Sequence, residues 1–121
     1  MRTMPCAPMH AVPAWRLWIG PLVWAAHFLA IYAFTAIACA RHVAISAFGV
    51  GAVAWFIGAV TAIAAAVLGV TIALALRDGR RPASRAPTAG FVHWLTAAIA
   101  CLVLLAIVWE ALPILFVPFC S

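Results

Sequence analysis

The stretch FGVGAVAWFIGAVTAIAAAVLGVTIALAL, residues 48–76, contains no charged side chain and exceeds the roughly 20 residues that a helix needs to cross a bilayer core. Two further apolar segments, at about residues 17–38 and 91–117, are also long enough. The composition agrees, because 69% of the 121 residues are hydrophobic and 7% are charged, against roughly 25% charged in soluble domains. The sequence therefore predicts an all-α integral membrane protein, a single domain of three transmembrane helices running up, down and up.

The connections and the arginines predict how this domain is oriented. Residues 40–46 read as a short turn, whereas residues 77–90 are polar and rich in Arg, Pro and Gly. With three spans, six arginines fall on one side and only Arg41 on the other, and the Arg-rich side of a membrane protein stays in the cytoplasm. We therefore expect the N-terminus on the cytoplasmic side of the membrane and the C-terminus on the outer side. The six are Arg2, Arg16, Arg77, Arg80, Arg81 and Arg85.

This orientation divides the chain into a cytoplasmic tail at residues 1–16, the transmembrane domain at 17–117 with its cytoplasmic loop at 77–90, and a periplasmic end at 118–121. One alternative is that the first segment is a cleaved signal sequence, because Ala38-Cys39-Ala40 resembles a signal-peptidase site. The apolar region of a signal has roughly 7–15 residues, however, and this segment is longer and carries Trp18 and Trp24. A membrane span is the favoured interpretation.

Small residues line one face of the second span. They fall within a stripe about 60° wide when successive residues are placed 100° apart. Helices in lipid associate through close backbone contact at small residues, so this stripe predicts a helix-packing face. An Ala-rich span can also show such a stripe by chance, and the sequence leaves open whether the first span, the third span or another protein fills it. The residues are Gly51, Gly58, Ala62, Ala65 and Gly69.

Glu110 is the only acidic residue within a span. Counted from Phe91, it lies about 28 Å along the third helix, in the outer interfacial zone. Arg41 begins the outer turn at a similar expected level. The sequence therefore predicts an ion pair between Arg41 and Glu110 that ties two helix ends together.

The cysteines divide according to the same topology. Cys39 and Cys120 are expected at the outer ends of the first and third spans, where an oxidising periplasm would favour a disulfide between them. Two free thiols are the alternative, because a shared depth does not bring their Cα atoms within about 7 Å.

His27 is expected near the bilayer midplane, where a polar group usually faces protein. A haem held by two histidines needs both at one depth, yet His93 lies about 12 Å from the level of His27 by helix rise. A hydrogen bond to another helix is therefore favoured, with His27 kept as a candidate cofactor ligand; we expect neither a metal site nor a resident cofactor. The N-terminal Met4, Cys6, Met9 and His10 are ligands that Cu(I) prefers, but prolines keep that segment irregular.

Several classes of function lack a sequence signal. The chain shows no paired carboxylates, no Ser/His/Asp set and no glycine-rich phosphate loop, so we expect no catalytic residue and no enzyme. The net charge of +5 reflects a shortage of acids as much as a surplus of arginines, which argues against nucleic-acid binding.

One pattern of residues points to a family. The first span reads Trp18-x-Gly20-Pro21-x-x-Trp24-x-x-His27-Phe28-x-x-x-Tyr32, and Cys39, Pro113, Pro118 and Cys120 follow. This pattern resembles small bacterial three-span proteins found near haem-copper cytochrome c oxidase genes. The resemblance covers the first span and the C-terminal end, and it carries no ligand or catalytic residue with it. It implies an accessory or assembly component of a respiratory terminal oxidase.

Together, these features predict a small inner-membrane protein that lies in the lipid bilayer. It would work by helix–helix association with other membrane protein subunits. One alternative is a homo-oligomeric transporter or channel that uses His27 and Glu110. Another is a metal- or haem-handling membrane protein that uses His27 with Cys39, or the N-terminal tail.

Overall fold

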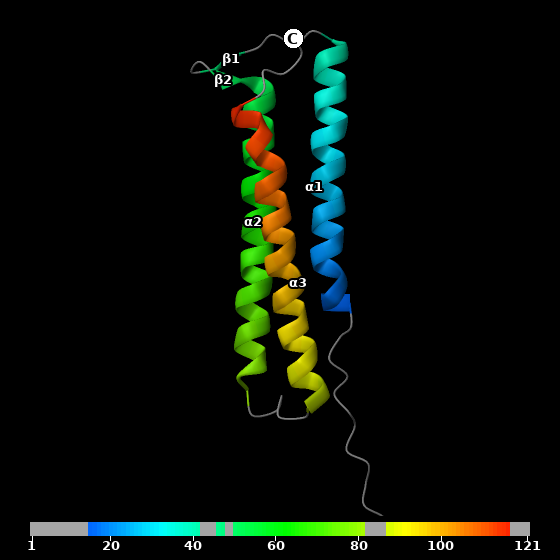
Figure 1. Cartoon of the computed structure of the whole chain (residues 1–121), viewed down its shortest axis with the longest axis vertical. Helices are drawn as coiled ribbons and strands as arrows, with labels where there is room; N and C mark the ends of the chain where they lie inside the picture. The colour runs from blue at the N-terminus through cyan, green and yellow to red at the C-terminus, as the bar shows by residue number, and fades with distance from the viewer. Residues whose placement is uncertain (1–14, 42–45, 48–49, 82–86, 117–121) are drawn as a thin grey trace, which may run out of the picture.

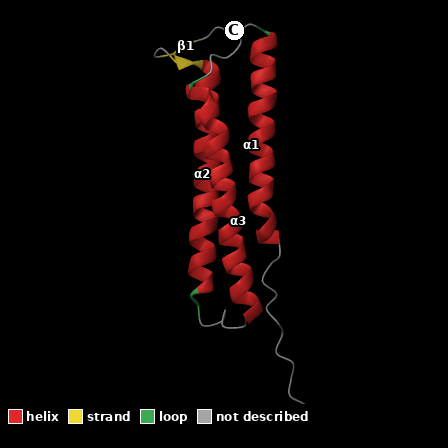
Figure 2. Ribbon diagram, viewed as in Figure 1, coloured by secondary structure: helices red, strands yellow, loops and turns green. Residues whose placement is uncertain are grey.

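The computed structural model describes residues 15–41, 46–47, 50–81 and 87–116, and three long helices account for most of them. These are α1 (Trp15–Ala40), α2 (Ala52–Gly79) and α3 (Pro87–Ala111), the last followed by the 3-10 helix η2 (Leu112–Leu115). Between α1 and α2, strands β1 (Ser46–Ala47) and β2 (Val50–Gly51) pair antiparallel. Figure 2 shows how little of the described chain is not helical.

All three helices are long and apolar enough to cross a membrane, which confirms the predicted all-α class and fits a multi-pass membrane protein. In Figure 1 α1 and α3 run in the same direction and α2 runs against them, as the up-down-up prediction requires. Many large apolar side chains on the outer surface of the bundle are exposed, Trp109 and Leu102 among them. Such a surface suits contact with lipid chains.

The bundle is held by two clusters of buried apolar side chains. One contains Ala64 and Leu68 of α2 with Ala100 and Ile107 of α3. The other contains Ala38 of α1 with Val53 and Ile57 of α2. Small alanines sit in both clusters, and they let neighbouring helix backbones approach closely, as membrane helices must do where apolar burial itself gives little gain.

Gly20 lies where α1 packs closely against α3. It is buried, and a Cβ atom placed on it would lie 3.1 Å from Cγ2 of Ile99 and 3.5 Å from Cγ2 of Val103. A larger residue at this position requires the Ile99 side chain to shift, and a bulky one would overpack this contact. The absence of a side chain at Gly20 thus permits this close contact between the two helices.

Helix α1 is shifted along the bundle relative to α3. His27 lies near the middle of α1, yet its side chain contacts Glu110, which stands one residue before the end of α3. Figure 1 shows the same offset, with α3 beginning well below the first turn of α1. This offset decides which side chains of the two helices meet.

An ion pair joins the beginning of α1 to the end of α2. Arg16 Nη1 donates a 2.7 Å hydrogen bond to Asp78 Oδ2, and Arg81 Nη1 lies 3.4 Å from Asp78 Oδ1. Asp78 thus partners the charges of two arginines at one end of the bundle, beyond the apolar part of α2. Such a contact fixes the position of the first turn of α1 against its neighbour.

Candidate functional site

Four polar side chains from three helices contact one another and form what we call the polar cluster. Trp24 and His27 come from α1, Thr61 from α2 and Glu110 from α3. In membrane proteins, polar side chains away from the interface usually face the protein interior and partner one another. The polar cluster is the place where all three helices are joined by polar contacts.

His27 lies at the centre of the polar cluster and is only 2% exposed. Its Nε2 atom is 3.1 Å from Oγ1 of Thr61, and its Nδ1 atom is 3.6 Å from Oε2 of Glu110. An ionised carboxylate only accepts hydrogen bonds, so the tautomer that satisfies most groups has its proton on Nδ1, facing Glu110. The hydroxyl of Thr61 then donates to Nε2. The predicted hydrogen bond of His27 to another helix is thereby observed.

Glu110 accepts a hydrogen bond from a second side chain of α1, that of Trp24. Trp24 Nε1 donates a 2.9 Å hydrogen bond to Oε1 of Glu110. The other oxygen, Oε2, is buried and has no hydrogen-bond partner among the described residues, and the same holds for Nδ1 of His27. At 3.6 Å these two atoms lie just beyond hydrogen-bond distance of each other.

The order Thr61, His27, Glu110 matches the nucleophile–base–acid order of hydrolytic triads, but the surroundings do not suit acyl transfer. Thr61 lies within α2, where backbone N–H groups bond to carbonyls four residues earlier. No N–H beside Thr61 is then left to stabilise an oxyanion. The chemistry that the polar cluster can perform is hydrogen bonding and charge pairing.

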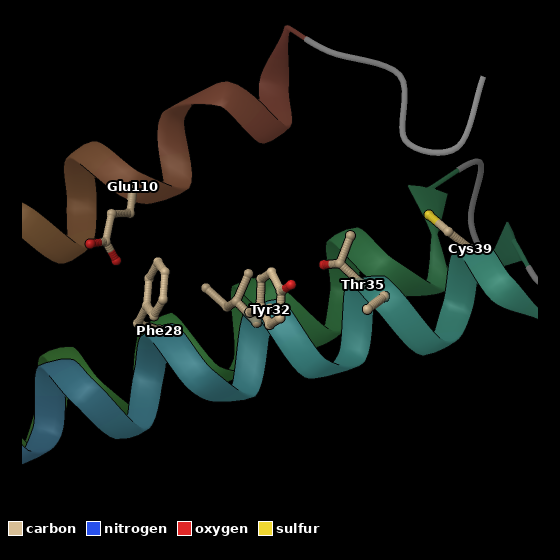
Figure 3. A pocket seen from close by; sticks show the side chains of 7 residues that line it. Phe28, Tyr32, Thr35, Cys39 and Glu110 are labelled. Carbon is tan, nitrogen blue, oxygen red and sulfur yellow. The ribbon is translucent and has the colours of Figure 1, made fainter.

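An apolar groove opens beside the polar cluster, between α1 and α3. It has a volume of about 460 Å³. Figure 3 shows Glu110 reaching from α3 toward Phe28 at one end of the groove, with Cys39 of α1 at the other end. The lining residues are Phe28, Ile31, Tyr32, Thr35, Ala36 and Cys39 of α1 and Glu110 of α3.

The predicted ion pair between Arg41 and Glu110 is not formed in the structure. Glu110 contacts Trp24 and His27, whereas Arg41 follows the last turn of α1, about 20 Å further along that helix. The two side chains together cannot span this distance. The offset of α1 against α3 is the physical reason, because it places Glu110 level with the middle of α1.

The predicted packing stripe of α2 points out of the bundle. Gly51, Gly58, Ala62 and Gly69 are exposed and Ala65 is half-buried, and no atom of the described chain lies within 4 Å of a Cβ placed on any of the three glycines. The side of α2 that packs against α1 and α3 carries Ile57 and Leu68 instead. Within the described residues, neither α1 nor α3 therefore fills the stripe.

The remaining predicted sites are only partly described. Cys39 is disulfide-bonded and Cys101 is a free, exposed thiol, whereas Cys120 lies outside the described residues, so the Cys39–Cys120 pairing stays a prediction. The N-terminal Met4, Cys6, Met9 and His10 also lie outside them.

His93 is buried in α3 and lies about 25 Å along that helix from Glu110. It is therefore far from the level of His27, so the described chain offers His27 no second imidazole at its depth. Nor do the described residues contain a group of three or more His, Cys, Asp or Glu side chains placed to hold a metal ion.

The sequence reasoning missed Thr61 and Trp24 as members of the polar cluster. A signal for Thr61 existed, because His27 precedes and Thr61 follows the turn at residues 40–46 by nearly the same number of residues. In two antiparallel helices joined by a short turn, such residues lie at the same level. Trp24 gave no comparable signal, since an indole on a membrane helix most often lies at the interface with lipid.

A search of protein-family models, of curated proteins and of solved structures finds no match to this chain.

Proposed function

We propose that this protein is a small bacterial inner-membrane subunit that works by binding the transmembrane helices of another protein. The partner class that we propose is a respiratory terminal oxidase, for which the protein would be an accessory or assembly component. The oxidase is suggested by the sequence pattern of the first span and the C-terminal end.

The observation that carries the proposal is the outward-facing stripe of α2. Gly58, Ala62 and Gly69 lie exposed on one side of the helix, with no atom of the described chain against the two glycines. A helix that only faces lipid has no need of glycine there, and Gly is less favourable than Ala within a helix by about 0.8–1.0 kcal/mol. Close contact with a second helix offsets this disadvantage, because small residues let the two backbones approach.

We propose further that the N-terminus lies in the cytoplasm and the C-terminus in the periplasm. The arginine distribution supports this orientation, since Arg77, Arg80 and Arg81 lie at the same end of the bundle as Arg16. Arg41 lies at the opposite end.

The experiment is to solubilise native membranes in a mild detergent, capture the tagged protein, identify its partners by mass spectrometry and record the redox difference spectrum. We expect oxidase subunits together with haem a or haem b absorbance. The protein alone, colourless and self-associated, would contradict the proposal.

Variants locate the binding face. Gly58→Leu and Gly69→Leu place bulk on the stripe where the chain itself has open space, so they should remove the oxidase subunits from the captured material while leaving the monomer folded. Ala59→Leu is the matched control, because Ala59 is exposed on α2 but lies about 90° from the stripe. If Ala59→Leu removed the partner as effectively as Gly58→Leu, the stripe would not be the interface.

A second candidate function is a homo-oligomeric small transporter or channel. The observation that favours it is the contact between His27 and Glu110, the two ionisable residues that such a function would use, 3.6 Å apart inside the bundle. It predicts assembly without foreign subunits, and proton or ion flux into vesicles of the purified protein that changes in His27→Ala. If vesicles that contain the assembled protein showed no proton or ion flux, the transporter or channel function would be excluded.

A further inference from the structure

The groove between α1 and α3 has two walls of different chemistry. Three turns of α1 provide apolar and aromatic side chains, and α3 provides the carboxylate of Glu110 (Figure 3). Its volume of about 460 Å³ lies within the roughly 300–1,000 Å³ of small-molecule sites. A groove of this kind accepts a largely apolar molecule with one group that complements the carboxylate.

The aromatic wall is a ladder of three rings on successive turns of α1. Phe28 stacks with Trp24 at a centroid distance of 5.9 Å and with Tyr32 at 6.4 Å, with the rings within about 21° of parallel. Phe28 and Tyr32 line the groove and are 48% and 68% exposed, so their rings are accessible. Aromatic faces carry negative potential and attract cations.

The charge of Glu110 is not balanced by an arginine of the described chain. Arg16 and Arg81 contact Asp78 at the other end of α2, and Arg41 lies about 20 Å along α1 from Glu110. Among the described residues, His27 is the one ionisable side chain that faces the carboxylate. Glu110 is thus the one acidic side chain that lines the groove, and it stands beside the aromatic ladder.

We propose that this groove binds a lipophilic organic cation. The positive centre lies between the carboxylate of Glu110 and the rings of Phe28 and Tyr32, and the apolar substituents extend along α1 toward Ile31 and Ala36. A lipid ammonium headgroup is the less suitable occupant, because Glu110 is level with the middle of α1, away from the interface where headgroups lie. The groove is formed by this chain alone, so binding to it does not depend on a partner subunit.

The test is equilibrium dialysis of the purified full-length protein, in detergent, against tetraphenylphosphonium. Tetraphenylborate is the matched probe, because it has nearly the same size and shape and the opposite charge. We expect saturable binding of tetraphenylphosphonium at one site per chain, and only non-saturable partition of tetraphenylborate. Equal uptake of the two ions would overturn the proposal, because it would show partition without charge recognition.

Variants assign the binding to the groove. Glu110→Gln retains an acceptor for Trp24 but loses the charge, and should weaken tetraphenylphosphonium binding by about tenfold or more. Phe28→Leu and Tyr32→Leu change exposed side chains, and each should weaken tetraphenylphosphonium binding several-fold. These two variants test the site even if Glu110→Gln fails to fold. Phe91→Leu, an exposed aromatic near the beginning of α3, is the control and should bind as the unchanged protein does. Unchanged affinity in Phe28→Leu and Tyr32→Leu would contradict the assignment.

Discussion

Nδ1 of His27 lies 3.6 Å from Oε2 of Glu110, and this contact joins the middle of α1 to the end of α3. Thr61 of α2 lies on the other side of the same imidazole, 3.1 Å from Nε2. Trp24 Nε1 donates to Oε1 of Glu110, and Thr61 bonds Nε2 of His27, so hydrogen bonds join α1 to both α3 and α2 and favour the register that forms them. The polar cluster and the offset of α1 against α3 are therefore compatible features of one arrangement.

Replacement of His27 should destabilise the bundle. His27→Ala leaves a cavity and removes the polar neighbour of both Thr61 and the buried oxygen of Glu110, so we expect the free energy of unfolding to fall by about 2 kcal/mol or more. Titration with a denaturing detergent, followed by circular dichroism, measures it. Leu29→Ala is the control, an exposed residue of the same helix expected to change stability by less than about 0.5 kcal/mol. Equal effects would show that the imidazole contacts do not hold the helices.

Two glycines should respond oppositely to the same substitution. Gly20→Leu forces a side chain against Ile99 and should lower the free energy of unfolding by about 1–3 kcal/mol. Gly69→Leu projects into open space and should leave the isolated protein unchanged or slightly more stable, because Leu favours a helix more than Gly does. The same titration compares them. A larger loss in Gly69→Leu would mean that the stripe packs within the chain after all.

The number and type of helices followed from the sequence, but their relative levels did not. Apolar length alone identifies three spans, since each exceeds what a bilayer core requires. The level of Glu110 was counted from Phe91, the first residue of an apolar run, whereas α3 begins at Pro87 and is offset against α1. Hydropathy does not predict such an offset, because a helix shifted by one turn still presents apolar side chains to lipid. Glu110 therefore contacts His27 and Trp24 and not the expected partner Arg41.

The stripe on α2 shows a second limit. Its periodicity was visible, but a small-residue face is equally compatible with a neighbour inside the chain and with a neighbour outside it. The structure shows Ile57 and Leu68 packed inside the bundle, and these bulky residues gave no periodic signal in a helix that is apolar on every side.

The orientation of the chain is a prediction that fusions can check. Green fluorescent protein becomes fluorescent in the cytoplasm and not after export, so a fusion before Met1 should fluoresce and a fusion after Ser121 should be dark. Alkaline phosphatase, which needs the periplasm, should be active after Ser121. Fluorescence of the C-terminal fusion would reverse the orientation proposed from the arginines.

The partner of Cys39 is open to direct identification. Cys39 is disulfide-bonded, and we expect its partner to be Cys120, because both are expected on the periplasmic side. Digestion without reduction, after free thiols are blocked, should give one linked peptide that contains both residues by mass spectrometry. A peptide that links Cys39 to Cys6 would contradict both the pairing and the proposed sides of the membrane.

The central claim is that the outward-facing stripe of α2 binds the helices of an oxidase, and site-specific photocrosslinking tests it most directly. Benzoylphenylalanine is placed at Ala62, within the stripe, or at Ala59, exposed on the same helix outside it, and living cells are irradiated. We expect an adduct with an oxidase subunit from position 62 and none from position 59. Adducts at position 62 with a second copy of this chain alone, or equal adducts from both positions, would contradict the claim.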